Sequence, residues 1–202
     1  KFGANATGVY HFFKTYGHKN VSIANGGMEA LKKIGVQMEI NTSEPHLKKS
    51  HYNIQESDVD TSSIVSKDDV LKAVLDIEKN GNKSKYIILD SRHRMEEILG
   101  YPNAAVDNVA RGGHIPGAKF AKFDAFIDMK GNKYFKSPDE MDALLKKLGV
   151  TKDKEIITYC HVGAGRGSYL YTVLKQLGYD NVKVYTGSYD EWGNDFNMPI
   201  RR

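Results

Sequence analysis

The chain has 202 residues, of which 40% are hydrophobic and 27% charged, so it is long enough and apolar enough to bury a core. Its net charge of +4 comes from scattered lysines without a basic, aromatic-interleaved run, which argues against nucleic-acid binding. No stretch has the length of a membrane-spanning helix, and the sequence shows no signal-peptide pattern from Lys1. The single cysteine excludes an internal disulfide and a multi-cysteine metal site. The compartment, cytoplasmic or periplasmic, stays open.

An internal repeat links the two ends of the chain. Residues 17–26 align without gaps with residues 178–187, and Gly, Asn, Val and Gly recur in register. Each copy reads as a helix end, a turn, a short buried strand and a glycine turn into another helix, which begins at Met28 in the first copy. We therefore expect residues 1–41 to be the C-terminal part of an upstream, non-catalytic domain of the same fold.

A polar stretch and then a capping signal follow this first segment. Residues 42–65 are rich in Ser, Asn, His, Asp and Thr, which predicts an extended linker between domains. Ser66 and Asp69 are spaced as a capping box, which predicts a helix running through Ile77. The second domain is thus expected to occupy residues 66–202.

Strand and helix patterns alternate through this second domain. Predicted strands are short apolar runs at 86–89, 155–159 and 182–185. Predicted helices begin at the Ser137 capping box and at Ser168. This alternation predicts an α/β domain with a mostly parallel central sheet flanked by helices.

Cys160 stands at the carboxyl end of a predicted strand, where α/β sheets bind ligands. The loop that follows consists of His161, Val162, Gly163, Ala164, Gly165, Arg166 and Gly167. Its three glycines let backbone N–H groups curl inward, and the next helix adds its positive end. Such a loop suits an anion, and we expect it to hold the pKa of Cys160 below the ordinary value of about 8.5. The alternative is that Cys160 is a small core hydrophobe.

Several motifs in this order resemble the rhodanese superfamily, particularly the tandem-domain thiosulfate sulfurtransferases. They are Asp90-Ser91-Arg92, Arg111-Gly112-Gly113-His114-Ile115-Pro116-Gly117-Ala118, Lys136 to Met141, Tyr159-Cys160, and Gly187-Ser188-Tyr189-Asp190-Glu191-Trp192. The resemblance runs through residues 66–200 and, more weakly, through 1–41. It implies a rhodanese fold and sulfur transfer through a Cys160 persulfide, without a metal or an organic cofactor.

The resemblance also assigns roles around the cysteine. It implies that residues 161–167 bind the substrate, while Arg92 and Arg111 are interpreted as lining the pocket mouth, with structural salt bridges as the alternative. Supporting roles are expected for Asp90, as a buried bonding partner of the active loop, for Ser168, at the start of a helix, and for His114, in the Gly-His-Ile-Pro turn. The implied partners are a small anionic sulfur donor, a thiol or cyanide acceptor and possible sulfur-relay proteins, with no nucleic acid or membrane.

Two alternative functions stay open from the sequence. Arg166 follows Cys160 by six positions, one more than in the commonest sulfurtransferase loop, and this Cys-x5-Arg spacing is also that of cysteine-dependent phosphatases and arsenate reductases. The other alternative is a persulfide carrier or docking module with little turnover of small molecules. Neither the physiological donor nor the acceptor can be named from the residues.

Overall fold

Five parallel strands form one sheet in the computed structural model, which describes residues 3–39, 48–49, 51–92, 109–131, 133–162 and 165–202. The strands are β1 (Ile64–Val65), β2 (Tyr86–Asp90), β3 (Lys119–Phe120), β4 (Glu155–Tyr159) and β5 (Val182–Tyr185). Their order is β1-β5-β4-β2-β3, so β4 is the central strand. The predicted α/β fold with a parallel sheet is confirmed.

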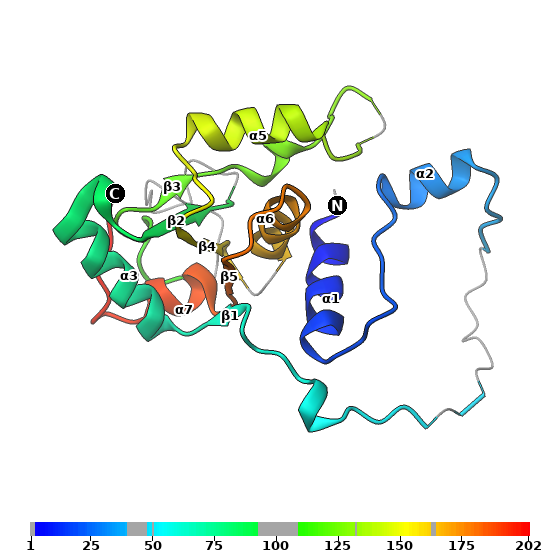
Figure 1. Cartoon of the computed structure of the whole chain (residues 1–202), viewed down its shortest axis with the longest axis horizontal. Helices are drawn as coiled ribbons and strands as arrows, with labels where there is room; N and C mark the ends of the chain where they lie inside the picture. Colours follow the sequence, from blue (N-terminus) through cyan, green and yellow to red (C-terminus); the bar gives the residue numbers. More distant parts are fainter. Residues whose placement is uncertain (1–2, 40–47, 50, 93–108, 132, 163–164) are drawn as a thin grey trace.

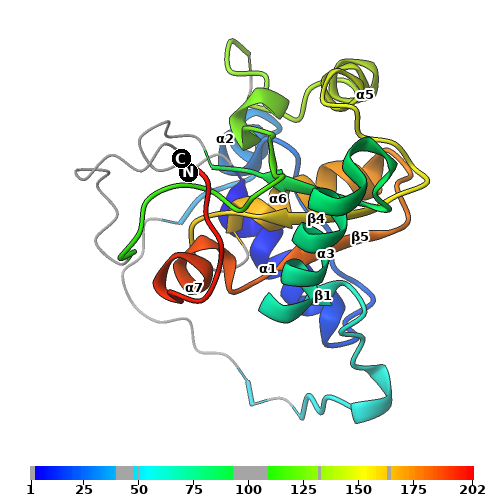
Figure 2. The same ribbon diagram turned by 90° about the vertical axis from the view of Figure 1, so that its left-hand side faces the viewer.

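Helices cover both faces of this sheet (Figures 1 and 2). The helices of the described residues are α1 (Ala4–Thr15), α2 (Gly27–Lys33), α3 (Lys67–Asn80), α5 (Pro138–Lys147), α6 (Gly165–Gln176) and α7 (Ser188–Asn194). Helices α3 and α7 cover one face of the sheet and α5 and α6 the other, while α1 packs on α6. Short 3-10 turns occupy Glu56–Asp58, Gly81–Lys83 and Phe123–Phe126. Among the residues described, no helix combines the length and apolar character that a membrane span requires.

The apolar strand residues explain why two helical layers form. Successive side chains on a strand point to opposite faces, so Ile87 and Ile88 enter different clusters. One cluster joins Ile87 to Leu170 of α6, and the other joins Ile88 to Val74 of α3 and Trp192 of α7. A strand buried on both faces needs a continuous apolar run, as the sequence of β2 has.

Both predicted capping boxes are present. Ser66 Oγ accepts from Asp69 N–H, and Ser137 Oγ accepts from Glu140 N–H, with the reciprocal carboxylate bonds in place. Helix α3 continues beyond the predicted end at Ile77 to Asn80, because its last residues lie at the surface and need no apolar pattern to stay helical.

The predicted linker boundary at residue 65 is wrong by a few residues. Ile64 and Val65 form β1, which pairs with β5 at Val184 and Tyr185. The backbone contact begins one residue earlier, where Val184 N–H donates to Ser63 O at 2.7 Å. A two-residue edge strand within a polar stretch has too short an apolar pattern to be recognised in the sequence.

The N-terminal segment packs on the second domain through α1. This helix lies against α6 on the side away from the sheet (Figure 1), and Thr7 Oγ1 donates to Gly165 O at 3.4 Å. The predicted helix after the first glycine turn is present as α2, but the buried strand expected at residues 21–24 is not formed. Within the described ranges no strand lies beside this segment to pair with it, and a single strand is not stable alone. The upstream domain stays a prediction.

Candidate active site

The central strand β4 places Cys160 at the carboxyl edge of the sheet. Tyr159, the last residue of β4, pairs with Asp90 at the end of β2. Its carbonyl accepts from Ser91 N–H at 2.9 Å and from Ser91 Oγ at 2.6 Å. The backbone before Cys160 is therefore fixed by two adjacent strands, and the cysteine itself is only 1% exposed.

A buried charge network lies beneath this strand end. Arg92 donates to both carboxylate oxygens of Asp90, at 2.6–3.0 Å, and to Gly113 O at 2.8 Å. Tyr159 Oη donates to Asp90 Oδ2 at 2.6 Å. Burial, and then the negative charge of Asp90, raise the pKa of Tyr159 well above its ordinary value, so that this phenol stays a donor.

The expectation that Arg92 lines the pocket mouth is therefore corrected. Its guanidinium is fully buried and stacks over the Tyr189 ring at 4.2 Å. The Asp90 carboxylate accepts hydrogen bonds from Arg92 and Tyr159, whereas the sequence predicted bonds to the backbone of the active loop. A buried carboxylate requires such a partner, and the adjacent Arg supplies it.

Ser188 places a side-chain hydroxyl next to the Cys160 thiol. Its Oγ lies 3.7 Å from Cys160 Sγ and accepts from Cys160 N–H at 3.3 Å. The same hydroxyl donates to Tyr185 O at 3.1 Å. Ser188 is fully buried, and its φ of 56° is in the left-handed region that non-glycine residues rarely adopt. This unusual backbone geometry brings the hydroxyl to the sulfur.

Sequence reasoning had not assigned Ser188 a role. The signal was present, because Ser188 follows β5, which is the parallel neighbour of β4. Side chains after adjacent parallel strands meet at the same edge of a sheet.

The first residues of α7 hold the loop that begins at Cys160. Tyr189 N–H donates to Cys160 O at 3.0 Å, and Asp190 N–H donates to His161 O at 2.8 Å. The His161 side chain is 8% exposed, whereas Val162 is 50% exposed and presents an apolar side chain to solvent. Val162 O accepts from the Cys160 thiol at 3.5 Å. The loop therefore encloses the sulfur and exposes Val162.

Helix α6 begins at Gly165, three residues earlier than predicted, so Gly165, Arg166 and Gly167 form its first turn and not a loop. Gly167 packs closely on β4, since a Cβ at this position would lie 3.4 Å from the backbone of Tyr159. Thr158 Oγ1 also donates to Gly167 O at 3.0 Å and ties the turn to β4. Arg166 is half-buried on this turn.

Three further residues were predicted to belong to the site: Gly163, Ala164 and Ser168. Gly163 and Ala164 lie outside the described residues. Ser168 lies within α6 and is not its N-cap; its hydroxyl is buried and has no hydrogen-bond partner in the described part of the chain. The predicted anion loop is thus shorter than expected and leads directly into a helix N-terminus.

Arg111 is also corrected from substrate binding to a structural position. Its guanidinium donates to the carbonyls of Gly193, Met198, Trp192 and Asp195, and so ties α7 to the C-terminal segment. His114 exchanges two backbone hydrogen bonds with Arg201, at 2.8 and 2.9 Å. These bonds involve the backbone of His114, so the role expected for its side chain stays a prediction.

The arrangement provides a thiol with hydrogen-bonding groups already in place. Cys160 is linked to α6 by four residues, so the positive end of this helix follows the thiol closely in the chain. The Ser188 hydroxyl can rotate from Tyr185 O toward the sulfur, which it reaches at 3.7 Å. The chemistry that these two features suit is nucleophilic attack by Cys160.

Comparison with protein families matches residues 73–195 to the rhodanese-like domain. Among curated proteins, the sulfur carrier protein TtuD of Thermus thermophilus is 35% identical over 195 residues, covering 96% of this chain and 66% of the relative. A putative thiosulfate sulfurtransferase of Haloferax volcanii is 32% identical over 199 residues, covering 96% and 64%. The chain thus spans just under two thirds of the length of these relatives.

Solved structures share the fold at lower identity. The wild-type structure of EanB superposes with a TM-score of 0.79 at 19% identity, over 98% of this chain and 44% of that chain. A complex of EanB Y353A with ergothioneine gives a TM-score of 0.81 at 20% identity, over 98% and 45%. At this identity the likeness establishes the fold alone.

Proposed function

The chain belongs to the rhodanese family, and from this premise we propose that it transfers sulfane sulfur from an anionic donor such as thiosulfate through a Cys160 persulfide. The observation that carries the proposal is the enclosure of the Cys160 sulfur beside the Ser188 hydroxyl and ahead of the α6 N-terminus. The names of the relatives, thiosulfate sulfurtransferase and sulfur carrier, support the same chemistry.

The proposed reaction has two steps. In the first, the Cys160 thiolate attacks the outer sulfur of thiosulfate, a Cys–S–S bond forms, and the bond to the sulfonate breaks with its electron pair leaving on sulfite. In the second, cyanide or a thiol attacks the outer sulfur, the S–S bond breaks, and the electron pair returns to the Cys160 thiolate. The Ser188 hydroxyl and the α6 amides stabilise the anionic sulfur in both states.

Intact-mass analysis tests this proposal. The protein is exposed separately to thiosulfate, mercaptopyruvate and an aryl phosphate, with a Cys160→Ser variant as control. We expect the mass of one added sulfur atom on the wild-type chain after thiosulfate, its loss on addition of cyanide, and no gain in the variant. A phosphoryl adduct without a sulfur adduct would instead support the alternative hypothesis that the protein is a phosphatase with a Cys-x5-Arg loop.

A persulfide carrier is the second candidate function. The name of the Thermus thermophilus relative favours it, as does a thiol that is 1% exposed beside an apolar Val162 that is 50% exposed. The carrier predicts that a cysteine desulfurase loads Cys160 while the steady-state turnover of thiosulfate and cyanide stays negligible. Rapid turnover of both small molecules would exclude it as the main activity.

A further inference from the structure

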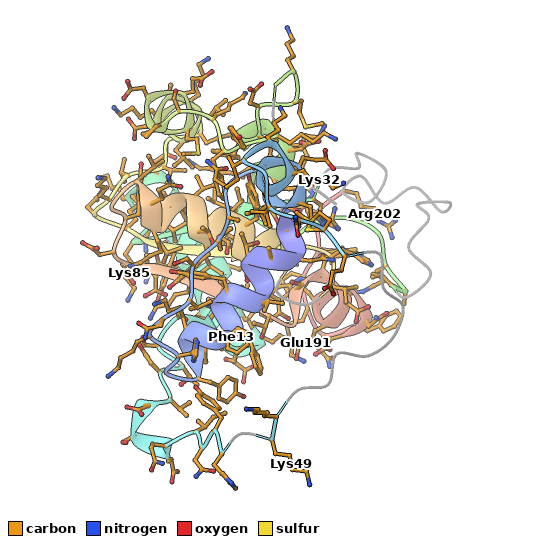
Figure 3. The ribbon with its side chains drawn as sticks, turned by 90° about the vertical axis from the view of Figure 1, so that its right-hand side faces the viewer. Phe13, Lys32, Lys49, Lys85, Glu191 and Arg202 are labelled. Carbon is orange, nitrogen blue, oxygen red and sulfur yellow. The ribbon has the colours of Figure 1, made fainter. Side chains whose placement is uncertain are left out.

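A polar cavity of about 200 Å³ lies at the edge of the sheet opposite Cys160. It is lined by the end of α1, the segment before β1, the C-terminal half of α6 and the start of β5, whereas Cys160 follows the end of the parallel strand β4. Figure 3 looks onto α1, whose end, marked by Phe13, lies beside the segment before β1, where Asp60 N–H donates to Thr15 O at 2.8 Å. Val182 is the only aliphatic residue of the lining. Pockets for drug-sized ligands begin at about 300 Å³, so this cavity suits a smaller, polar ligand.

Three lysines from three different elements line the cavity: Lys14 of α1, Lys175 of α6 and Lys183 of β5. Each ammonium group donates one hydrogen bond to a backbone carbonyl of the described chain, those of Lys19 (2.9 Å), Asp180 (3.1 Å) and Ser62 in that order. An ammonium has three N–H donors, so each lysine keeps two for a ligand. Lys14 and Lys175 also offset the negative ends of their helices, but Lys183 stands in a strand and has no helix end to offset.

The carboxylates of the lining do not cancel this charge. Asp60 and Asp180 are the two acidic residues that line the cavity. Hydrogen bonds from the hydroxyl and the backbone N–H of Ser62 hold the pKa of Asp60 below its ordinary value, so that this carboxylate is already engaged in its own turn. Three ammonium groups against two carboxylates leave one positive charge, which favours an anion in the cavity.

A chain of hydrogen bonds between neutral groups also ends at the cavity. His11 is 3% exposed, and burial lowers its pKa, so its ring is neutral at pH 7. Its Nε2 lies 2.9 Å from Ser63 Oγ, and the Ser63 hydroxyl is in turn hydrogen-bonded to the Tyr171 side chain. Burial raises the pKa of Tyr171, so this phenol keeps its proton and can donate it to a ligand.

We propose that this cavity binds a small inorganic oxyanion of the phosphate or sulfate class. The ammonium groups of Lys14, Lys175 and Lys183 and the hydroxyl of Tyr171 donate hydrogen bonds to its oxygens. Since Lys14 belongs to the N-terminal segment and the other three residues to the second domain, the bound anion ties these two parts together. The site lies at the opposite edge of the sheet from Cys160, so the inference goes beyond the proposed sulfur transfer and does not depend on it.

Titration of the isotope-labelled protein with sodium phosphate, followed by the NMR shifts of its backbone amides, tests the inference. Sodium chloride keeps the ionic strength constant, because exposed charges are screened by salt. We expect saturable shifts at residues 60–63 and 180–183, and the same pattern with sulfate. Lys175→Met should weaken the affinity about 10-fold or more, the effect of losing a charge-assisted hydrogen bond. The matched control is Lys152→Met, because Lys152 Nζ also donates to a backbone carbonyl, that of Leu177 at 2.8 Å, but lies outside the lining.

Three results would overturn the proposed oxyanion site: shifts that do not saturate, an affinity that Lys175→Met leaves unchanged, or shifts confined to residues 160–162 and 165–168. The last of these would place the anion at the Cys160 loop instead. Lys14→Met serves as a second variant on the other helix, so that the test does not depend on one substitution. Repeating the titration with Cys160→Ser should leave the shifts at residues 60–63 and 180–183 unchanged, whether or not the wild-type protein transfers sulfur.

Discussion

The hydroxyl of Ser188 lies 3.7 Å from the sulfur of Cys160 and is held there by a backbone φ of 56°. Residues held in such a rarely populated backbone conformation cluster at functional sites, where the strain is part of the mechanism. Here the candidate role is donation of a hydrogen bond to the thiolate or persulfide, while Tyr185 O receives that proton when the sulfur is neutral. Two substitutions of Ser188 can distinguish the effect of the hydroxyl from the effect of the backbone conformation.

Replacing Ser188 by Ala or by Gly should lower the rate of persulfide formation about 10- to 100-fold, the effect of losing one hydrogen bond to a charged group. Gly suits the left-handed backbone and should be more stable than Ala by about 1 kcal/mol. Single-turnover mass analysis measures the rate and urea unfolding the stability. Full activity in the Gly variant would show that the backbone, and not the hydroxyl, is what Cys160 needs.

The second prediction concerns the buried pair of Arg92 and Asp90. Arg92→Met leaves the Asp90 carboxylate buried without its cation, which should cost about 3–5 kcal/mol of unfolding free energy. The control is Arg201→Met, since Arg201 is exposed and pairs with Glu78 at 3.7 Å; its cost should be below about 1 kcal/mol. Urea unfolding measures both. A stable Arg92→Met protein with a raised KM for thiosulfate would support the original pocket-mouth interpretation instead.

Features that depend on residues close together in the sequence could be predicted, whereas features that depend on contacts between distant residues could not. Local signals were reliable, since the capping boxes at Ser66 and Ser137 and the apolar run of β2 all gave the observed elements. The strand-end position of Cys160 followed from such signals too. Motif resemblance then gave the family, which no local pattern could give.

The errors have a common physical cause, because the sequence does not show where a long side chain turns. Arg92 and Arg111 both stand in loops at the expected edge, but one turns into the core toward Asp90 and the other toward the carbonyls of α7. The early start of α6 was missed because Gly165 and Gly167 are poor helix formers. In the structure Gly167 packs against β4, and its carbonyl accepts a hydrogen bond from Thr158 Oγ1. Ser188 required knowledge of which strands are neighbours.

The third prediction follows from the carbonyls that Arg111 binds. Arg111→Lys keeps the charge but loses the planar fork that reaches Gly193 and Met198 together, so the C-terminal segment should loosen. We expect backbone amides of residues 195–202 to exchange with deuterium at least several-fold faster. Arg202→Lys is the control, because within the described residues the Arg202 guanidinium donates one hydrogen bond, to Gly112 O at 3.4 Å. Equal exchange in both variants would contradict the proposed tie.

The fourth prediction is a loss of stability in mild acid through His11. This side chain is 3% exposed, contacts Ser63 Oγ at 2.9 Å and packs edge-on against the Tyr171 ring at 4.8 Å. Burial lowers the pKa of His11 below 6.5, so the unfolded chain binds the proton more readily than the folded chain. The contribution is therefore fully present above pH 6.5 and is lost as the pH falls below it.

Thermal unfolding at pH 7.5, 6.5 and 5.5 measures this effect. The wild-type Tm should fall between pH 6.5 and 5.5, and the fall should be smaller in His11→Gln. His51→Gln, at an exposed position, should keep the wild-type pH dependence. A pH dependence that is the same in all three proteins would assign the acid sensitivity to other groups.

The last prediction separates donor binding from sulfur release at Arg166. This residue lies half-buried on the first turn of α6, six residues after Cys160, and it carries a positive charge. Thiosulfate carries two negative charges, so Arg166→Ala should lower kcat/KM for persulfide formation about 10- to 100-fold, and Arg166→Lys should restore part of it. Release of sulfur to cyanide from a preloaded persulfide should change less, since the small acceptor makes less use of that charge. Lys175→Ala, near the other end of the same helix, serves as control. Equal losses in both half-reactions would indicate that Arg166 supports the shape of the loop and does not bind the donor.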